Sequence, residues 1–323
     1  MNDHLQVSVL RELHGRLTLL ILAVFFLLGT VWSPNLSAQI VLLVVGIGTI
    51  GLAHGAMDHR VGELLFRPHF GNRWVIAFAL FYIGFGGIFV GLWIVAPVVA
   101  LAAFLFYSAV HFGSAAPAPL SLFVAFVRGS LPIILPMTFH SEETSKIFGW
   151  VVATQIDLHS YAFLISLACS ICFLTTVAFS VYRRSPWFAA EATLLVLLNL
   201  MSPPLVSFAI YFVLIHSTRH LIELANWFEP VDIRKGFRRI TWEALPLSAL
   251  TVLGMTAAFF MLDPVQLEAG LIRVLFITLS ALTVPHMVLT ALAERSFANY
   301  DLSNARWTSA FNAAERLRRW SKQ

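Results

Sequence analysis

Five of the eleven histidines in this 323-residue chain lie within or at the ends of long apolar runs. An imidazole in such a position is costly, and it usually has a function. His216 and His220 are four residues apart, so both rings project from the same side of a helix. Neutral imidazoles without a thiolate suit a divalent iron, copper or zinc ion, and ligand type alone does not choose among these metals. The sequence therefore predicts a metal site whose ligands are His54, His111, His216 and His220.

Carboxylates near these histidines are candidates for orienting the rings, because a ligating histidine commonly donates its second N–H to a carboxylate or carbonyl. Asp58 follows His54 by four residues, and Glu223 follows His216 by seven and shares its helix face. Taken singly, each histidine is equally well explained by a hydrogen bond to a neighbouring helix; the set of four is not. The predicted supporting residues are Asp58, Glu191, Arg219, Glu223 and His286. The histidines expected in loops or at interfaces are His4, His14, His69, His140 and His159, and His59 is expected to point elsewhere.

The elements that must position these residues are membrane-spanning helices. Hydrophobic residues make up 59% of the chain and charged residues only 12%, whereas soluble domains carry about a quarter charged residues. This excludes a soluble enzyme, a nucleic-acid-binding protein, a disordered chain and a secreted disulfide scaffold. We predict an all-α, multi-pass transmembrane bundle of about 8 to 10 spans, ten preferred. The ten apolar runs are roughly 17–32, 37–54, 74–95, 97–112, 120–139, 160–182, 187–201, 204–224, 242–262 and 269–292.

The basic residues predict the orientation of the bundle. If every second connection is cytoplasmic, 17 of the 21 lysines and arginines fall on the cytoplasmic side and only Lys146 falls on the opposite side. The positive-inside rule then places both termini in the cytoplasm and favours an even number of spans. In this orientation all five membrane histidines lie in the cytoplasmic half, although the charge count did not use them. We therefore expect residues 1–293 to form a single catalytic membrane domain and residues 294–323 a cytoplasmic amphipathic tail.

Two local patterns have structural explanations. Gly46 to Gly51 matches a dinucleotide-binding glycine motif, but no strand precedes it, and glycines at this spacing let membrane helices approach closely. Cys169 and Cys172 lie in the middle of one apolar run, where we expect them to pack as small apolar residues.

The histidine motifs resemble those of a known family. Gly51-Leu-Ala-His-Gly-Ala-Met-Asp-His59, His111-Phe-Gly113 and His216-Ser-Thr-Arg-His220 are similar, in order, to motifs of the Brp/Blh family of membrane β-carotene 15,15′-dioxygenases. The likeness extends from about residue 50 to residue 290. This chain departs from the pattern at Ile215 and Ala53, which border two of the histidines. Further similar stretches are Arg128-Gly129 with Pro132 and Pro136, Glu191 ahead of Pro203-Pro204, and Pro285-His286-Met287.

The resemblance implies a non-haem Fe(II) enzyme that cleaves β-carotene with O₂ at its central double bond to give two molecules of retinal. The iron ligands carried over by motif are the four histidines named above. The implied partners are a carotenoid, O₂ and the lipid bilayer, with delivery of retinal to a rhodopsin and no nucleic acid. The implied location is the cell membrane of a prokaryote. Aromatic residues near the ligands in sequence are expected to line a polyene tunnel: Phe104, Phe106, Tyr107, Phe208, Tyr211 and Phe212.

Three alternatives remain open at this point. A desaturase or hydroxylase acting on another apolar lipid would need an H-x-x-H-H cluster for two irons, which this chain lacks. A transporter could use the histidines and carboxylates as a proton relay. A haem-binding electron carrier would place two histidines on facing helices.

Overall fold

The computed structural model of the chain describes residues 3–114, 121–229, 232–262, 264 and 266–298. This part of the chain is built from helices and contains no strand. The predicted all-α membrane bundle is therefore confirmed. Of the predicted tail, residues 299–323 lie outside the described residues, and α14 extends to Ala298.

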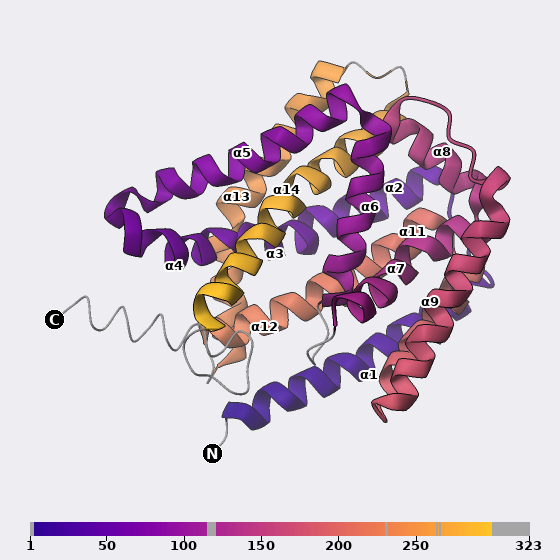
Figure 1. The fold of residues 1–323 in the computed structure, drawn as a ribbon, viewed down its shortest axis with the longest axis horizontal. Helices are drawn as coiled ribbons and strands as arrows, with labels where there is room; N and C mark the ends of the chain where they lie inside the picture. Colours follow the sequence, from indigo (N-terminus) through magenta and orange to yellow (C-terminus); the bar gives the residue numbers. More distant parts are fainter. Residues whose placement is uncertain (1–2, 115–120, 230–231, 263, 265, 299–323) are drawn as a thin grey trace.

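The helices follow one another with short connections (Figure 1). Two of the long membrane segments are made of consecutive helical pieces that continue one another. The elements are α1 (Asp3–Gly29), α2 (Leu36–Gly46), η1 (Ile47–Gly51), α3 (Leu52–Ala56), α4 (Asp58–Phe70), η2 (Gly71–Arg73), α5 (Trp74–Val95), α6 (Pro97–Ser114), α7 (Leu122–Phe139), α8 (Ser141–Val152), η3 (His159–Tyr161), α9 (Ala162–Tyr182), α10 (Pro186–Met201), α11 (Pro204–Ala209), η4 (Ile210–Ser217), α12 (Thr218–Phe228), α13 (Ile233–Leu262) and α14 (Leu267–Ala298).

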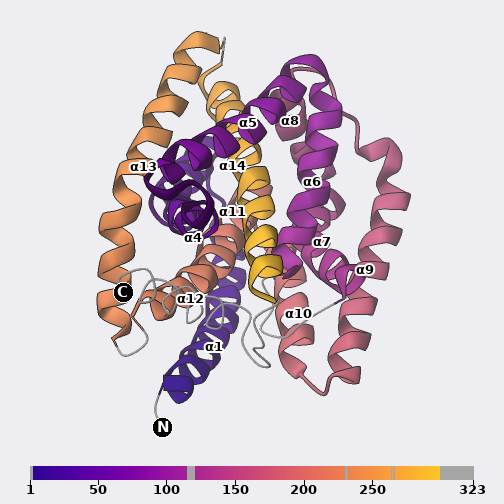
Figure 2. The same cartoon turned by 60° about the vertical axis from the view of Figure 1, so that its left-hand side comes forward.

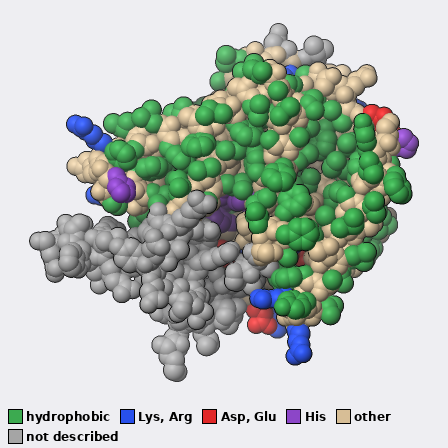
Figure 3. Space-filling view, in the orientation of Figure 1, with side chains coloured by type: hydrophobic (Ala, Val, Ile, Leu, Met, Phe, Trp, Pro, Cys, Tyr) green, Lys and Arg blue, Asp and Glu red, His purple; other side chains and the backbone are tan. Residues whose placement is uncertain are grey.

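Eight helical segments within the described residues are long and apolar enough to cross a membrane. One of them, Leu36–Val95, is 60 residues long and covers two of the predicted runs, and α10 is apolar but shorter than 18 residues. These two features account for the difference from the preferred count of ten, which stays a prediction. Hydrophobic side chains cover most of the face shown in Figure 3, with the visible lysines and arginines mainly near its margins, as a lipid-facing surface requires.

The two ends of the bundle carry different connections (Figure 2). The end of α13, the start of α14 and the junction of α5 with α6 lie at one end, and the start of α1 and the α9–α10 connection lie at the other. Arg183 and Arg184 occupy the α9–α10 connection. These positions lie at the ends that the charge count assumes for them, and the full ten-span alternation stays a prediction.

Close helix contacts position the histidine-bearing segments. A Cβ atom on Gly113 of α6 would overlap the carbonyl oxygen of Ala125 on α7, and a Cβ atom on Gly129 of α7 would overlap the carbonyl oxygen of Ala109 on α6. Only glycine allows two backbones to approach so closely. The glycine of the His111-Phe-Gly113 motif therefore determines how near α6 lies to α7.

Two π-helical segments, η1 and η4, pack against each other next to the site. A Cβ atom on Gly46 would come within 2.9 Å of the Val213 side chain, and one on Gly51 within 2.9 Å of Phe212. The interpretation of these glycines as points of helix contact is confirmed. Cys169 lies in the hydrophobic core, and both cysteines are free.

Candidate metal centre

Five histidine rings from five elements meet inside the bundle. His54 comes from α3, His111 from α6, His216 from η4, His220 from α12 and His286 from α14. The centroid of the His54 ring lies 5.6 Å from that of His216, 5.0 Å from that of His220 and 5.3 Å from that of His286. Segments more than 200 residues apart in the sequence thus contribute to one cluster.

Three of the rings are arranged as metal ligands would be. One ring nitrogen each of His54, His111 and His216 lies within 4.8 Å of the other two. The Nε2 atoms of His111 and His216 face each other at 3.1 Å. Nitrogens bound to one metal ion at about 2.1 Å and at right-angled to tetrahedral angles would lie roughly 3.0 to 3.4 Å apart. The donor set therefore fits a divalent transition metal.

The ring of the fourth predicted ligand, His220, has its centroid 5.0 Å from that of the His54 ring, and the two ring planes are inclined at 73°. Its nitrogen atoms are not part of the three-histidine group. The structure thus brings all four predicted ligands together, and three of them place one ring nitrogen each close enough to share a metal ion.

Hydrogen bonds orient two of the rings. The Nδ1–H of His54 donates to the carbonyl oxygen of Gly51 at 3.0 Å, which leaves Nε2 with its lone pair available to a metal. His286 Nδ1 donates to the carboxylate of Asp58 at 2.7 Å, and both side chains are almost fully buried. Asp58 therefore supports His286, as a carboxylate four residues after His54 was expected to do, although for a different histidine.

Tyr82 of α5 belongs to the same network and was missed by the sequence analysis. Its hydroxyl donates to Asp58 at 2.6 Å. The only available signal was the burial cost of a carboxylate, which requires hydrogen-bond donors around it. That signal does not say which of the six tyrosines would provide the hydroxyl.

An apolar cavity of about 300 Å³ adjoins the cluster. His54, His111 and His286 form part of its wall, as do Asp58 and Tyr82. Its outer part is lined by Ile83 of α5 and Leu250 of α13, which are 72% and 63% exposed on the apolar surface. The cavity thus runs from the lipid-facing side of the bundle to the histidines.

Of the aromatic residues expected to line a tunnel, three line this cavity: Phe104, Phe208 and Phe212. Phe106 does not, because it is 62% exposed on the outer face of α6. Tyr107 packs against Phe89 and Phe104 and donates its hydroxyl to the carbonyl oxygen of Ser280. Tyr211 is buried against Phe112 on another side of the bundle core.

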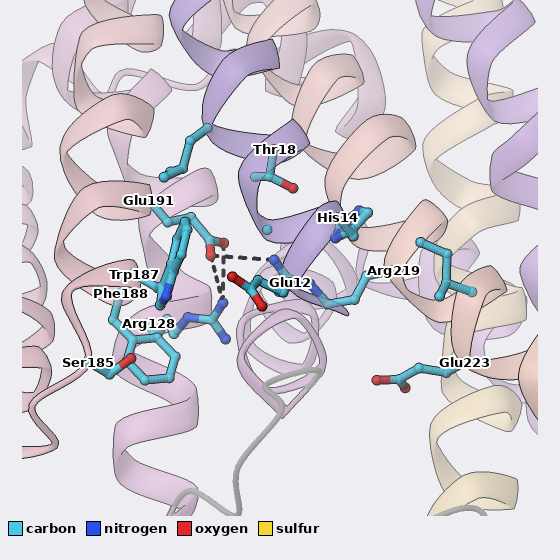
Figure 4. A pocket seen from close by; sticks show the side chains of 13 residues that line it. Glu12, His14, Thr18, Arg128, Ser185, Trp187, Phe188, Glu191, Arg219 and Glu223 are labelled. Carbon is cyan, nitrogen blue, oxygen red and sulfur yellow. Dashed lines mark hydrogen bonds and ion pairs between the residues drawn. The ribbon is translucent and has the colours of Figure 1, made fainter. Parts of the chain in front are cut away.

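Three of the predicted supporting residues lie elsewhere. Glu191 of α10 pairs with Arg128 of α7 at 3.2 Å and with Arg219 of α12 at 3.4 Å (Figure 4). These residues, together with Glu223, line a second cavity that shares no lining residue with the one at the histidines. Arg219 and Glu223 are close to His216 and His220 in sequence. Their side chains nevertheless line a cavity that α1 and α10 also line, and not the cavity at the histidines.

Comparison with known proteins identifies relatives. A family model described as beta-carotene 15,15′-dioxygenase matches residues 45–294. A beta-carotene 15,15′-dioxygenase from uncultured marine bacterium 66A03 is 26% identical over 246 residues, which cover 74% of this chain and 88% of that protein. A probable beta-carotene 15,15′-dioxygenase Blh from Halobacterium salinarum is 26% identical over 306 residues, covering 83% of this chain and 87% of that protein. No solved structure gives a significant match.

Proposed function

The chain belongs to the beta-carotene 15,15′-dioxygenase family, and on this premise we propose that it cleaves β-carotene with O₂ at the central 15,15′ double bond to give two molecules of retinal. In this reaction one carbon–carbon double bond is broken, each of its carbons receives one oxygen atom, and no external reductant is consumed. The observation that carries the proposal is the buried histidine cluster in the wall of an apolar cavity that reaches the lipid-facing surface.

The proposed cofactor is one Fe(II) ion held by His54, His111, His216 and His220. The mutual approach of three of these rings and the absence of thiolates from the described cluster support a metal of this class. Iron would supply the redox chemistry toward O₂ that no side chain can perform. The protein would hold the ion through neutral imidazoles, orient His54 through Gly51 and exclude bulk water from the site.

The shape of the apolar interior supports a long substrate. A smaller cavity of about 60 Å³ shares four wall residues with the cavity at the histidines. It extends the apolar space past the cluster toward α7 and α8, where Pro136 and Phe148 line it. Cleavage at the middle of a symmetric polyene needs apolar space on both sides of the metal. We infer that the polyene occupies both cavities and separates at the shared wall. The shared residues are Phe104, Ser108, Phe112 and Phe208.

His286 is proposed to support the reaction rather than to hold the metal. Its Nδ1–H is occupied by Asp58, and Asp58 in turn accepts from Tyr82, so the ring is fixed with Nε2 on the side of the other histidines. A ring held in this way can donate or accept a proton at one stated atom, Nε2, next to the reacting bond.

Carotenoid entry is proposed to take place directly from the bilayer. The exposed side chains of Ile83 and Leu250 at the outer part of the cavity support this route, because a polyene dissolved in lipid would meet apolar surface there. The proposed location is the cell membrane of a prokaryote, with both termini in the cytoplasm, residues 1–293 as the catalytic domain and retinal passed to a rhodopsin.

Neither a desaturase-like enzyme nor a histidine-relay transporter is favoured. The family is named for carotenoid cleavage. The single metal-competent group among the described residues also gives no support to a two-iron centre. In a relay, the histidines would line an aqueous path, whereas phenylalanine and leucine provide ten of the 24 residues that line the cavity here.

The test is product analysis joined to a metal count. Protein purified in detergent and loaded with Fe(II) should convert β-carotene to retinal in the presence of O₂, with two retinals formed per carotene and one iron bound per chain. Chromatography of the products and elemental analysis of the protein provide the readouts. Iron-loaded protein that binds β-carotene but forms no retinal, or two irons per chain, would overturn the proposal.

A further inference from the structure

A second cavity, of about 380 Å³, lies between α1, α7, α10 and α12. It is separate from the cavity at the histidines and is drawn in Figure 4. Its lining residues Glu12 and His14 lie near the start of α1, and Ser185 lies in the α9–α10 connection beside Arg183 and Arg184. Nothing in the proposed carotenoid reaction uses it.

Unpaired polar atoms gather in the walls of this cavity. Among the described residues, seven buried side-chain nitrogen or oxygen atoms have no hydrogen-bond partner. Three of the seven belong to residues that line this one cavity: Nε2 of His14, Oγ1 of Thr18 and Nη1 of Arg128. These side chains are 7%, 2% and 9% exposed. A buried polar group without a partner is destabilising, so a ligand that supplied hydrogen-bond partners to these three atoms would gain stability.

Charged residues of both signs line the cavity: the carboxylates of Glu12, Glu191 and Glu223 and the guanidinium groups of Arg128 and Arg219. The guanidinium groups of Arg128 and Arg219 both point at Glu191, and both converge on that single buried carboxylate (Figure 4). Glu12 also lines the cavity, but it is paired with Arg16 at 2.6 Å. Glu223 lies at the α12 side of the cavity, away from Arg128. Arg128 pairs with Glu191 through Nη2, which leaves its Nη1 without a hydrogen-bond partner and open to a ligand with an acceptor oxygen.

The remaining walls are apolar. The polar side chains of this cavity are surrounded by Leu19, Trp187, Phe188 and Ile222. Trp187 is 42% exposed at the edge of the bundle. Tryptophan at this level is typical of the membrane–water interface. A ligand of this site must combine several acceptor oxygens with carbon atoms that contact the apolar walls. Basic pockets between membrane helices on the cytoplasmic side bind lipid head groups in this way.

We propose that this cavity binds the phosphate diester of an anionic phospholipid from the cytoplasmic leaflet. Nη1 of Arg128 and the hydroxyl of Thr18 donate to the phosphate oxygens. His14 forms a hydrogen bond with the backbone of Leu214 and presents Nε2 to the head group. Because α1 contributes His14 and Thr18 while α10 and α12 contribute Glu191 and Arg219, the bound lipid fastens α1 to the rest of the bundle.

The experiment measures thermal unfolding of the delipidated, full-length protein in detergent, together with native mass spectrometry for bound lipid. The probes are phosphatidylglycerol, phosphatidylcholine and inorganic phosphate. Phosphatidylglycerol should raise the Tm and remain bound, and phosphatidylcholine should act more weakly. If inorganic phosphate raises the Tm as much as phosphatidylglycerol does, the occupant is free phosphate, and the assignment to a phospholipid is overturned.

Two variants separate ligand binding from packing. Thr18→Val keeps the shape of the side chain and removes an unpaired hydroxyl, so the lipid-free protein should be as stable as the native protein or more so. Its affinity for phosphatidylglycerol should nevertheless fall roughly tenfold. Arg128→Lys keeps the positive charge beside Glu191 but loses Nη1, and it should weaken lipid binding in the same way.

The matched control is Ser248→Ala on α13, which removes another unpaired buried hydroxyl far from this cavity and should leave lipid binding unchanged. Retinal formation by the Thr18→Val protein, measured in the same preparation, should be retained, so failure of this inference is distinguishable from failure of the proposed carotenoid reaction. The inference is overturned if no phosphate-bearing probe raises the Tm, or if Thr18→Val and Arg128→Lys respond to phosphatidylglycerol as the native protein does.

Discussion

Four rings of the histidine cluster are held by three kinds of partner. His54 is held by a backbone carbonyl of its own helix, His286 by a carboxylate, and His111 and His216 by their mutual approach. Two imidazole Nε2 atoms that face each other at 3.1 Å inside an apolar bundle are explained by a shared metal ion. Metal binding and turnover at this site depend on individual ring nitrogens, so single substitutions test the proposed role of each residue.

Replacing His216 with alanine should remove bound iron and abolish retinal formation. The ring is 3% exposed and approaches both His54 and His111, so its loss removes a central ligand of the proposed set. Elemental analysis of purified protein provides the measurement. His159→Ala is the control, because His159 is exposed in the connection before α9, and it should keep a full complement of iron. An iron-free but active His216→Ala protein would contradict the assignment.

Replacing Asp58 with asparagine should leave most of the bound iron but slow retinal formation by roughly 10- to 100-fold, the usual effect of losing a carboxylate that orients a histidine. The four proposed ligands are untouched, whereas His286 loses its charged acceptor. Tyr82→Phe removes one hydrogen bond to the same carboxylate and should have a smaller effect. Parallel metal and turnover assays on both variants provide the test. Complete loss of iron from the Asp58→Asn protein would instead make the network part of the metal centre.

At the scale of helices, the site depends on contacts that only glycine permits. In the α6–α7 contact, backbone lies against backbone at Gly113 and Gly129. Where α2 and η1 meet η4, Gly46 lies against Val213 and Gly51 against Phe212. Short π-helical segments occur often at functional sites, because the extra residue per turn re-aims the side chains that follow. Here η4 contains His216 and ends immediately before α12, which carries His220.

Replacing Gly113 with alanine should destabilise the protein by about 1 to 3 kcal/mol or more, because its methyl group would overlap the Ala125 carbonyl and force α6 away from α7. His111 would move with α6, so iron affinity should fall as well. Gly91→Ala on α5 is the matched control, since no atom lies within 4 Å of its added Cβ. It should be neutral or stabilising by up to about 1 kcal/mol. Equal melting temperatures for the two variants would contradict the close-contact explanation.

Replacing Ser108 with phenylalanine should stop β-carotene cleavage while leaving bound iron in place. Ser108 is a small residue in the wall shared by the two apolar cavities, and a phenyl ring there would fill the proposed path of the polyene. Carotenoid binding and retinal formation are the measurements. Phe106→Leu is the control, because Phe106 faces outward, and it should retain activity. Unchanged turnover by Ser108→Phe would place the substrate elsewhere.

For the whole molecule, the orientation in the membrane can be tested directly. In a background with Cys169→Ala and Cys172→Ala, single cysteines are placed at Asn72 and Gln155, which are exposed in connections expected on opposite sides. A membrane-impermeant maleimide added to intact cells should label Gln155→Cys and not Asn72→Cys, because the basic residues predict the Asn72 side to be cytoplasmic. The reverse labelling pattern would contradict the predicted orientation, and permeabilised cells provide the control for reactivity.

Some predictions from sequence were reliable because they concern local rules. The helices follow from run length and apolar composition, and the helix contacts at Gly46 and Gly51 follow from the absence of side chains. The four histidines come together because motif order and helix direction constrain their depth. Others were not: Glu191, Arg219 and Glu223 were expected beside the histidines but line another cavity. Spacing along a helix says on which side a residue leaves it, but not which neighbouring helix lies on that side.

By itself, the sequence determined the class of the protein, since hydropathy acts locally along the chain, and it predicted a common depth for the membrane histidines. It placed Phe104 and Phe106 together, yet one lines the cavity and the other faces outward, because residues two positions apart on a helix point about 200° apart. Only the tertiary structure decided that Tyr82 supports Asp58, that His14 and Thr18 meet Arg128, and which walls two cavities share. These are contacts between helices far apart in the sequence, and they depend on how closely whole helices pack.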